Sequence, residues 1–513
     1  MTISTSSDRP PVRRHILLIL LSLIALQGAL AEEPDTLAHR SKYEMRAVWL
    51  STIWGLDWPR ASTEAAQKRE LDEQLDLLRE NGINTIFLQV RGRGDVIYPS
   101  AIEPMHPRFY GKRYDPLAYA VEACHKRGMT VHAWITTLPL EDRSYRRRLR
   151  GVTPFYDKYK GHTKRHRGKD FMDPADSLTG IHLASLAREI AEKYPVEGIQ
   201  LDYIRYPDFP ARFPDDRDYR DAHTLLPKAE WRRSNITAIV RRIHETLTET
   251  DSTVLLSAAT IGAYDQISGT PHIGWTARGD VYQDPVAWER AGAIDFITTM
   301  TYSRGSTFGP IIRDWRDKLS IPIVIGLGAF RTLREEGGWP AQQVIDQVAE
   351  VQSDSLLAGV ALFRARQITE RSHGLREKLA EQCFRRPVLP HAPIVSADST
   401  LLYPRDLTMT TEEDSAKLTW CGASTDRPCL YAIYLSTDSI PDTTTGRDLI
   451  AVTTEQSATI RLPESKDGER FVTLEISCYD LHTGLEAFIP GGAAIYQRPE
   501  PEEEEKKNAD TSD

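Results

Sequence analysis

The sequence predicts an α/β fold: a (β/α)8 TIM barrel followed by a small all-β sandwich. Between residues 45 and 363, short β-rich apolar runs alternate with amphipathic stretches, which is the pattern of repeated βα units. Eight strand candidates occur in this region, the number that closes a barrel. From about Pro390 the pattern changes to short alternating strands with turn residues and no helical stretch, which predicts a separate sandwich.

The barrel elements are expected in alternating order along the chain. The strands are expected at residues 45–50, 85–90, 130–135, 198–203, 254–258, 294–299, 322–325 and 359–363. Apolar residues at helical spacing, such as Leu71, Leu75 and Leu78, predict a helix over residues 64–80. Further helices are expected at residues 116–127, 180–194, 228–248, 341–353 and 374–383. A doubly wound open sheet is the alternative, but no glycine-rich dinucleotide fingerprint follows the first strand.

The chain is expected to divide into five parts. Residues 1–31 have the features of a secretory signal, because Arg13 and Arg14 precede an apolar run and small residues precede Glu32. The remaining parts are the barrel at 42–386, a proline-containing linker at 387–393, the sandwich at 394–497 and a disordered acidic tail at 498–513. The sandwich strands are expected at residues 417–420, 430–436, 449–453, 458–462 and 471–479.

The signal-like segment at 1–31 predicts that the protein is exported to the periplasm or cell envelope, or is secreted. An uncleaved membrane anchor is the alternative for the N-terminal segment. No later apolar run approaches the roughly 20 residues that a membrane-spanning helix needs.

Composition narrows the expected partners. The net charge of −9 argues against a nucleic-acid partner for the whole chain. The five cysteines lie far apart without a CxxC pair, so neither a metal site nor a cofactor is expected. In an oxidising compartment, Cys421 could form a disulfide with Cys429 or Cys478, whereas buried thiols are the alternative.

Candidate catalytic residues follow the predicted strands. Asp202 ends the fourth strand, in the segment Gly-Ile-Gln-Leu-Asp-Tyr-Ile-Arg-Tyr-Pro, and strand ends of this kind form the pocket of a TIM barrel. Glycosidic hydrolysis normally needs two carboxyl groups. The candidates for the second are Asp95 and Asp284, with Asp57 slightly behind them. The alternative for Asp202 is that it only fixes a loop by hydrogen bonds.

Candidate substrate-binding residues have the same positions at or near strand ends. Arg91 and Arg205 could hold a carboxylate, and structural ion pairing is the alternative. Flat rings could stack on sugars, or belong to the core; the candidates are Trp54, Trp134, Tyr206 and Tyr302. His132 shares its side of the strand with Trp134, where a sugar contact competes with a core histidine.

The third βα loop, residues 138–171, has an unusual composition. Its cations, including Arg146, Arg147 and Arg148, alternate with Tyr145 and other aromatic residues. In an acidic chain this local positive charge would attract an anionic glycan, and the attraction would weaken with salt. A solvated, mobile loop is the alternative.

Several short motifs occur in a characteristic order. They are Glu44-Met45-Arg46-Ala47-Val48-Trp49-Leu50, Asp57-Trp58-Pro59, Gln89-Val90-Arg91, Gly94-Asp95, Asp115-Pro116-Leu117, His132-Ala133-Trp134, Asp173-Pro174, Tyr282-Gln283-Asp284, Ile294-Asp295-Phe296, Met300-Thr301-Tyr302 and Gly359-Val360-Ala361-Leu362-Phe363. Together they resemble the glycosyl hydrolase-like 10 family of exported bacterial barrel proteins, from about residue 44 to 363. The sandwich more loosely resembles a fibronectin type III module, with Trp420 and Tyr431 in core positions.

The family resemblance implies a glycosidase that cleaves bacterial cell-wall glycan, in particular peptidoglycan strands without stem peptides. The Asp202 segment is superficially similar to that of the chitinases, but Ile204 and Arg205 stand where the chitinase acid would be. Two alternatives remain open. One is a hydrolase of a dietary or host polysaccharide, and the other is a non-catalytic envelope protein that binds glycan.

Overall fold

The computed structural model describes residues 41–391, 403–412, 414–422, 427–437, 440–463, 471–490 and 494–497. The expected signal at 1–31 and the tail at 498–513 lie outside the described residues, as do parts of the linker and sandwich. Their boundaries therefore stay predictions.

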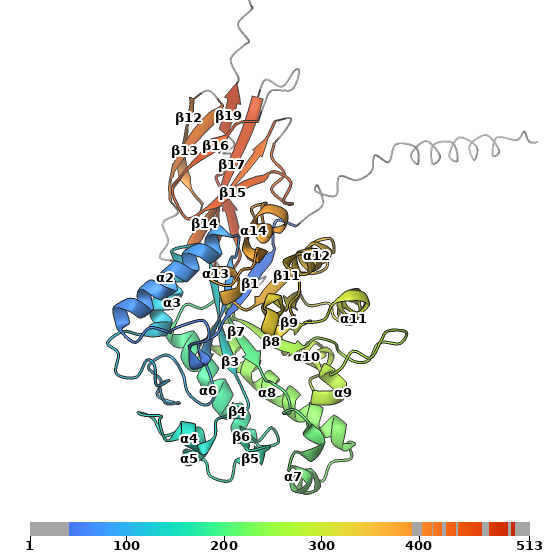
Figure 1. Ribbon diagram of the computed structural model, residues 1–513. Helices are drawn as coiled ribbons and strands as arrows, with labels where there is room; N and C mark the ends of the chain where they lie inside the picture. The colour runs from blue at the N-terminus through green and yellow to red at the C-terminus, as the bar shows by residue number, and fades with distance from the viewer. Residues whose placement is uncertain are drawn as a thin grey trace, which may run out of the picture.

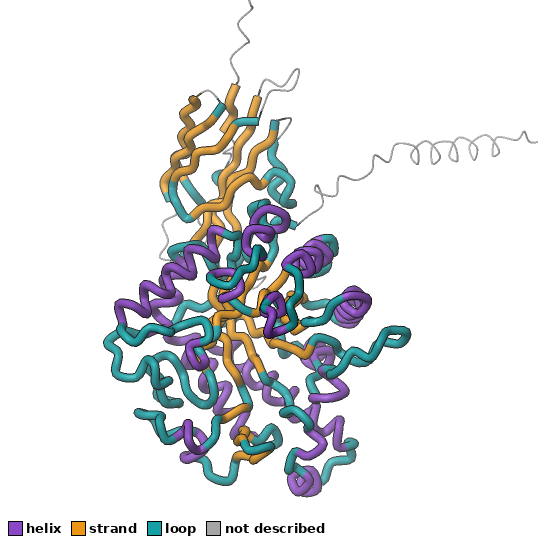
Figure 2. The backbone as a smooth tube through the Cα atoms, viewed as in Figure 1, coloured by secondary structure: helices purple, strands orange, loops and turns teal. Residues whose placement is uncertain are grey.

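Eight parallel strands close into a barrel, and the prediction of a TIM barrel is confirmed. The strands are β1 (Met45–Leu50), β2 (Thr85–Arg91), β3 (Thr130–Thr136), β7 (Gly198–Asp202), β8 (Leu255–Ile261), β9 (Phe296–Met300), β10 (Ile323–Leu327) and β11 (Gly359–Phe363). Because β1 pairs with both β2 and β11, the sheet has no edge, and the open-sheet alternative is wrong. Figure 2 shows the strands surrounded by helices.

Alternation along each strand separates the inside of the barrel from the outside. On β1, Met45, Ala47 and Trp49 belong to a cluster inside the barrel, whereas Val48 and Leu50 pack in the larger core under the helices. The inside is not wholly apolar. Gln200 accepts a hydrogen bond from Trp49 Nε1 at 2.7 Å and donates one to Thr298 Oγ1 at 3.1 Å.

The larger outer helices are α2 (Glu64–Glu80), α3 (Pro116–His125), α6 (Ser177–Lys193), α8 (Lys228–Thr250), α11 (Phe308–Lys318) and α12 (Ala341–Gln352). The predicted helix at 374–383 is a short α14 (Leu375–Lys378) that continues into a π-helical turn (Leu379–Cys383). Sequence analysis missed α11, because Gly309 and Pro310 resemble a turn. Proline is tolerated in the first turn of a helix, and Ile311, Ile312 and Trp315 bury the inner face.

The third βα loop has its own secondary structure. It contains two short helices, α4 (Arg143–Arg146) and α5 (Phe155–Lys158), and a three-stranded sheet of β4 (Pro139–Leu140), β6 (Lys169–Met172) and β5 (Thr163–His166). Arg167 and Gly168 form the two-residue turn between β5 and β6, with φ values of 48° and 82°. Positive φ at both positions is typical of the hairpin turns that match strand twist.

The C-terminal part consists of two antiparallel sheets, so the prediction of an all-β module is confirmed. One sheet contains β12 (Arg405–Glu412), β13 (Ser415–Cys421) and β16 (Ser457–Arg461); the other contains β15 (Leu449–Thr453), β14 (Cys429–Ser436), β17 (Phe471–Asp480), β18 (Glu486–Phe488) and β19 (Ala494–Gln497). The buried rings of Trp420 and Tyr431 lie 5.3 Å apart between the sheets. The fibronectin likeness stays a prediction. All five cysteines are free thiols, so the structure contains none of the disulfides considered above.

The C-terminal module contacts the N-terminal ends of the barrel strands. Lys42, just before β1, forms an ion pair with Glu486. His482 lies 4.0 Å from Glu197, which precedes β7, and 3.5 Å from Asp251, which precedes β8. Figure 1 shows the module at one end of the barrel and β4–β6 at the other.

Candidate active site

Asp202 lies at the C-terminal end of β7, opposite the module. Its Oδ1 accepts a hydrogen bond from the Tyr203 backbone N–H at 2.7 Å, and its Oδ2 accepts one from Trp134 Nε1 at 3.1 Å. Burial raises the pKa of Asp202 to about 6, although these two hydrogen bonds and the charge of Arg205 oppose the shift. A carboxyl with this pKa can exist in both protonation states near neutral pH, as acid–base catalysis requires.

Two tyrosines lie close to this carboxyl. Burial first, and then the charge of Asp202, raises the pKa of Tyr302 well above its usual value. The Tyr302 ring packs between Phe330, at 5.3 Å, and Phe363, at 5.9 Å. Tyr203 has 42% of its surface exposed and a φ of 53°, so its ring points outward beside the acid. The site therefore combines one buried acid with one exposed ring.

Arg205 is held within the same loop. Its guanidinium lies 4.7 Å from the Tyr203 ring centroid, and Nη1 contacts Asp208 Oδ1 at 3.0 Å and the Tyr206 carbonyl at 3.1 Å. Among the described residues, its buried Nε has no hydrogen-bond partner. Arg205 thus adds positive charge beside Asp202 and keeps one donor unused.

A second exposed ring stands on the loop after β1. Trp54 is 57% exposed, and the Arg93 guanidinium lies 4.2 Å from its ring centroid. Arg93 also forms an ion pair with Glu141 at 2.6 Å. Burial is the main reason that the pKa of Tyr203 is raised, and the charge of Arg93 opposes this increase. Arg93 therefore lies near Tyr203, the residue that follows Asp202.

Glu141 is a candidate carboxylate that sequence analysis missed. It follows β4 in the third βα loop, five residues beyond the end of β3. The only signal in the sequence is an acid within a basic loop, and nothing in its spacing distinguishes Glu141 from other loop acids. Only the fold of that loop brings Glu141 to Arg93.

Asp95 and Asp284 have other partners for their oxygens. Asp95 is buried and accepts hydrogen bonds from the Arg93 backbone N–H and the Tyr145 hydroxyl, both at 2.9 Å. Asp284 is the N-cap of α10 (Pro285–Arg290), accepts from the Ala287 N–H at 3.2 Å, and accepts from the Tyr264 hydroxyl at 2.8 Å. These contacts favour structural roles, and a catalytic role for either residue stays a prediction.

Asp57 is also fully engaged. Its oxygens accept from the Ser51 N–H at 2.9 Å and the Arg366 N–H at 3.3 Å, and Arg364 Nε lies 3.3 Å away. Burial raises the pKa of Asp57 to about 6 despite Arg364. Asp57 therefore links the loops that follow β1 and β11.

Three predicted substrate-binding residues, Arg91, His132 and Tyr206, are buried in the interior. Arg91 contacts both oxygens of Glu103, at 2.8 and 2.7 Å. His132 packs edge-on between Phe87 and Phe296, and neither ring nitrogen has a hydrogen-bond partner among the described residues. Burial lowers the pKa of His132 to about 3, so it is neutral. These contacts favour the structural alternatives for Arg91 and His132.

Tyr206 is buried too. Its ring contacts Phe213 and Tyr282 at 5.3 and 5.4 Å, and Asn235 donates to its hydroxyl at 3.2 Å. Trp134, by contrast, touches Asp202 directly, and Trp54 and Tyr302 border the same mouth. The structure therefore brings Asp202, Trp134, Tyr302 and Arg205 together, whereas Trp54 contacts Arg93.

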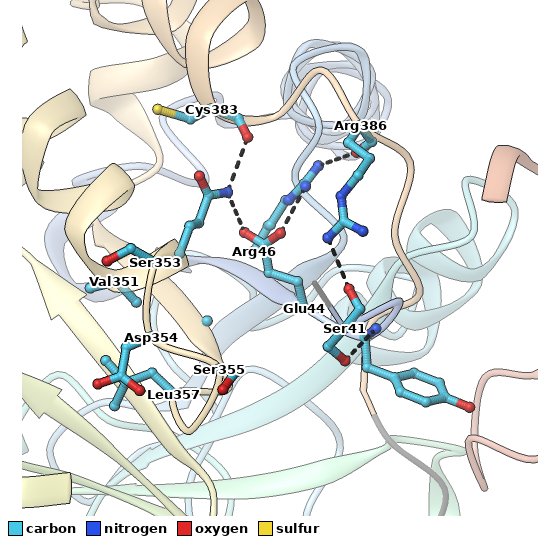
Figure 3. Close-up of a pocket in the computed structure, with 13 residues that line it drawn as sticks. Ser41, Glu44, Arg46, Val351, Ser353, Asp354, Ser355, Leu357, Cys383 and Arg386 are labelled. Carbon is cyan, nitrogen blue, oxygen red and sulfur yellow. Dashed lines mark hydrogen bonds and ion pairs between the residues drawn. The ribbon is translucent and has the colours of Figure 1, made fainter. Parts of the chain in front are cut away.

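A cavity of about 470 Å³ lies at the opposite end of the barrel, among Ser41, Glu44, Arg46, Ser355 and Arg386 (Figure 3). There Glu44 forms an ion pair with Arg46 at 2.8 Å, and Arg386 donates to the Ser41 carbonyl at 2.8 Å. These contacts give Glu44, just before β1, a structural role at the N-terminal end of the barrel. Asp295, at the start of β9, likewise accepts from the Leu256 N–H at 2.6 Å.

The described residues contain neither a metal-binding cluster nor a membrane-spanning helix. No group of three or more histidine, cysteine or acidic side chains has the arrangement of a metal site. No helix within the described ranges has the length and apolar character to cross a membrane.

A TIM barrel with a buried carboxyl of raised pKa at a strand end and exposed rings nearby has features that a glycosidase site requires. The sequence from 44 to 328 matches the family Glycosyl hydrolase-like 10, more than half of the chain. The chain belongs to this family, and the prediction of a glycosidase is confirmed.

Two relatives extend the comparison. Glycosyl hydrolase DigH of Escherichia coli O6:H1 is 26% identical over 71% of this chain and 95% of its own length. Glycosyl hydrolase YngK of Bacillus subtilis is 24% identical over 82% of this chain and 88% of its own. Among solved structures, the PgaB (BpsB) glycoside hydrolase domain of Bordetella bronchiseptica has a TM-score of 0.49 and 14% identity, and covers 66% of this chain and 98% of that one.

Proposed function

We propose that this protein hydrolyses the glycan of bacterial cell walls, in particular peptidoglycan strands without stem peptides, with Asp202 as the proton-transferring carboxyl. The observation that carries the proposal is the environment of Asp202. It is buried at a strand end, contacts Trp134, and has a pKa of about 6. The protonated form can give its proton to the glycosidic oxygen as the bond breaks.

A second carboxylate then attacks the sugar carbon or activates a water molecule. Glu141 is our first candidate, because Arg93, which forms an ion pair with it at 2.6 Å, also stacks on the exposed ring of Trp54. Asp95, Asp284 and Asp57 remain the alternatives. A separation between the two carboxyls of roughly 5–5.5 Å would give retention, and roughly 6.5–9.5 Å inversion.

Charge and exposure support the anionic substrate. Arg147, Arg148 and Arg150 are exposed in the third βα loop, and none has an acidic partner among the described residues. Muramic acid carries a carboxylate, which arginine recognises in a two-pronged geometry. Trp54 and Tyr203 offer flat surfaces for sugar rings. Export through the segment at 1–31 would bring the enzyme to the wall.

The test compares Asp202→Asn with wild type on peptide-free glycan strands, intact peptidoglycan and plant polysaccharides. The control is Asp221→Asn, an exposed carboxylate on α7 (Asp216–Asp221) in the same βα connection. We expect wild type and the control to release reducing ends from the peptide-free strands, and Asp202→Asn to release none.

Each other outcome has a definite meaning. Cleavage of a plant or host polysaccharide alone would overturn the cell-wall substrate but keep the enzyme. No release from any glycan would favour the non-catalytic alternative. Full activity of Asp202→Asn would remove Asp202 from the mechanism.

A further inference from the structure

We propose that Phe209, Trp275 and Arg167 form an outer binding site for a carboxylate-bearing sugar, on the same glycan strand but beyond the sugars whose bond is cleaved. This inference rests on the proposed function, because it assumes that a glycan strand lies across the mouth of the barrel. It adds a separate site, built from three loops, that the cleavage chemistry does not use.

The first component is a pair of exposed rings. Phe209, in the loop after β7, is 52% exposed, and Trp275, in the loop after β8, is 40% exposed. Their centroids lie 5.4 Å apart with the planes at 90°. Two large apolar surfaces from separate loops therefore meet in solvent. An edge-to-face pair leaves one ring face open, and such a face can stack on the apolar face of a sugar.

The second component is an unpaired cation. The Arg167 guanidinium lies 4.4 Å from the Phe209 ring centroid. Two other cations of the hairpin have acidic partners, since Arg165 pairs with Asp170 and Lys164 with Asp173 and Asp218. Arg167 has no acidic partner in the part of the chain that the structure describes. A carboxylate on the bound sugar would provide one.

The third component is a rigid support. His166, next to Arg167 on the hairpin, is 2.8 Å through Nε2 from the carbonyl of Asp208, the residue before Phe209. Tyr206 and Phe213 are buried on either side of Phe209 and anchor its loop. The ring and the cation are thus held in one geometry before a ligand arrives, which lowers the entropy cost of binding.

The backbone conformation of Phe209 also supports a binding role. Its φ of 59° lies in the left-handed region, which is unfavourable for a residue with a side chain. That conformation places the ring in solvent rather than in the core. Strain of this kind concentrates at functional sites.

The outer site repeats an arrangement found beside Asp202. Trp54 and Tyr203 are also exposed, also have φ values near 55°, and also carry an arginine over the ring, Arg93 and Arg205 respectively. Arg205 links the two regions, because it touches the Tyr203 ring and the Asp208 carboxylate. Phe209 follows Asp202 by seven positions, a span of at most about 25 Å. One strand can therefore reach both.

The test measures binding in the Asp202→Asn background, so that the glycan is not consumed. Single changes Phe209→Ala, Trp275→Ala and Arg167→Gln are compared with Leu225→Ala, a fully exposed apolar residue in the same βα connection. The probes are long peptide-free glycan strands, tetrasaccharides cut from them, long strands whose carboxyls have been reduced to alcohols, and single-stranded DNA.

We expect Phe209→Ala and Trp275→Ala each to weaken binding of long strands by about tenfold, as for the loss of one aromatic anchor, and to leave tetrasaccharide binding unchanged. Arg167→Gln should weaken binding of the carboxylated strands by about fivefold and leave that of the reduced strands unchanged. Leu225→Ala should match the parent protein. Equal thermal unfolding temperatures confirm that the surface variants are folded.

Long strands that bind all variants equally would overturn the outer site, while the effect of Asp202→Asn on cleavage would still support the proposed function. If wild type neither cleaves nor binds cell-wall glycan, the proposed function fails. The same variants are then titrated with a polyuronate, and unchanged affinity there overturns the outer site as well. Weakening for DNA but for no glycan would also overturn it.

Discussion

Trp134 Nε1 donates a hydrogen bond to Asp202 Oδ2 over 3.1 Å, between neighbouring strands of the barrel. The indole therefore stabilises the ionised form of the acid, against the larger effect of burial. The protonation state of the proposed acid is set by this balance, and the balance can be changed without touching the carboxyl itself.

Trp134→Phe should raise the pKa of Asp202 by about one unit above its value of about 6, because a hydrogen bond to a charged group contributes about 1.5 kcal/mol. The measurement is kcat/KM as a function of pH. If Asp202 acts as the acid, activity is lost as pH rises through its pKa, and the variant loses it at higher pH. If the pH at which kcat/KM falls is the same in wild type and variant, another group controls that fall. If instead kcat/KM falls as pH decreases through the pKa of Asp202, the residue acts as base or nucleophile.

Asp202→Asn should stabilise the protein at pH 8. The folded-state pKa is raised from 3.8 to about 6, so the ionised carboxyl costs about 3 kcal/mol above pH 6 and nothing below pH 3.8. The asparagine amide cannot accept both the Tyr203 and the Trp134 hydrogen bonds, and this loss destabilises the variant by about 1 kcal/mol. Urea unfolding should therefore show a gain of about 2 kcal/mol at pH 8 that disappears by pH 4. A constant difference across this range would contradict the raised pKa.

Glu141→Gln should reduce kcat by on the order of 100-fold or more if Glu141 is the second carboxylate. The matched control is Asp95→Asn, whose amide cannot accept from both the Arg93 N–H and the Tyr145 hydroxyl, and which should lower the unfolding temperature more than the rate. The reverse pattern, a folded but inactive Asp95→Asn enzyme beside an active Glu141→Gln enzyme, would restore Asp95 as the partner of Asp202.

Glu103→Gln tests whether Arg91 is structural. Burial raises the pKa of Glu103, but Arg91 and His182 outweigh it and lower the pKa to about 2. Leaving Arg91 buried without its partner should cost about 3–5 kcal/mol at pH 7. The stabilisation is present above the ordinary pKa of 4.5 and is lost as pH falls toward 2. Urea unfolding at pH 7 and pH 3 measures this, and a large change in KM without loss of stability would favour a substrate contact.

His482→Ala should loosen the C-terminal module. His482 lies beside Glu197 and Asp251; burial opposes its protonation, but these acids raise its pKa. Its contribution is present at acidic pH and is lost as pH rises through that raised pKa. Calorimetry should show one unfolding transition for wild type at pH 5.5 and two for the variant. The exposed His223→Ala is the control, and identical traces for all three proteins would exclude this role.

The barrel could be predicted from the sequence because its strands are short apolar runs whose limits depend on local residues. The expected ranges of β1 and β11 match the structure. Helix α11 could not be found in this way, since Gly309 and Pro310 locally favour a turn, and burial of residues such as Ile311 and Trp315 outweighs them.

In the candidate site, too, the residues at strand ends could be predicted and those positioned by loops could not. Asp202 and Trp134 lie at strand ends, so the barrel alone places them. The Glu141–Arg93 ion pair depends on the path of a long loop. The hydrogen bond from the Ala287 N–H to Asp284 forms because Asp284 is the N-cap of α10. Neither relation follows from residue spacing.

The C-terminal module sits on the face where Lys42, Glu197 and Asp251 precede their strands, and Asp202 opens on the other face. The described residues of the module therefore lie away from the end of the barrel where Asp202 is found. Whatever the module adheres to would hold the enzyme from behind, with its mouth directed away from the point of attachment.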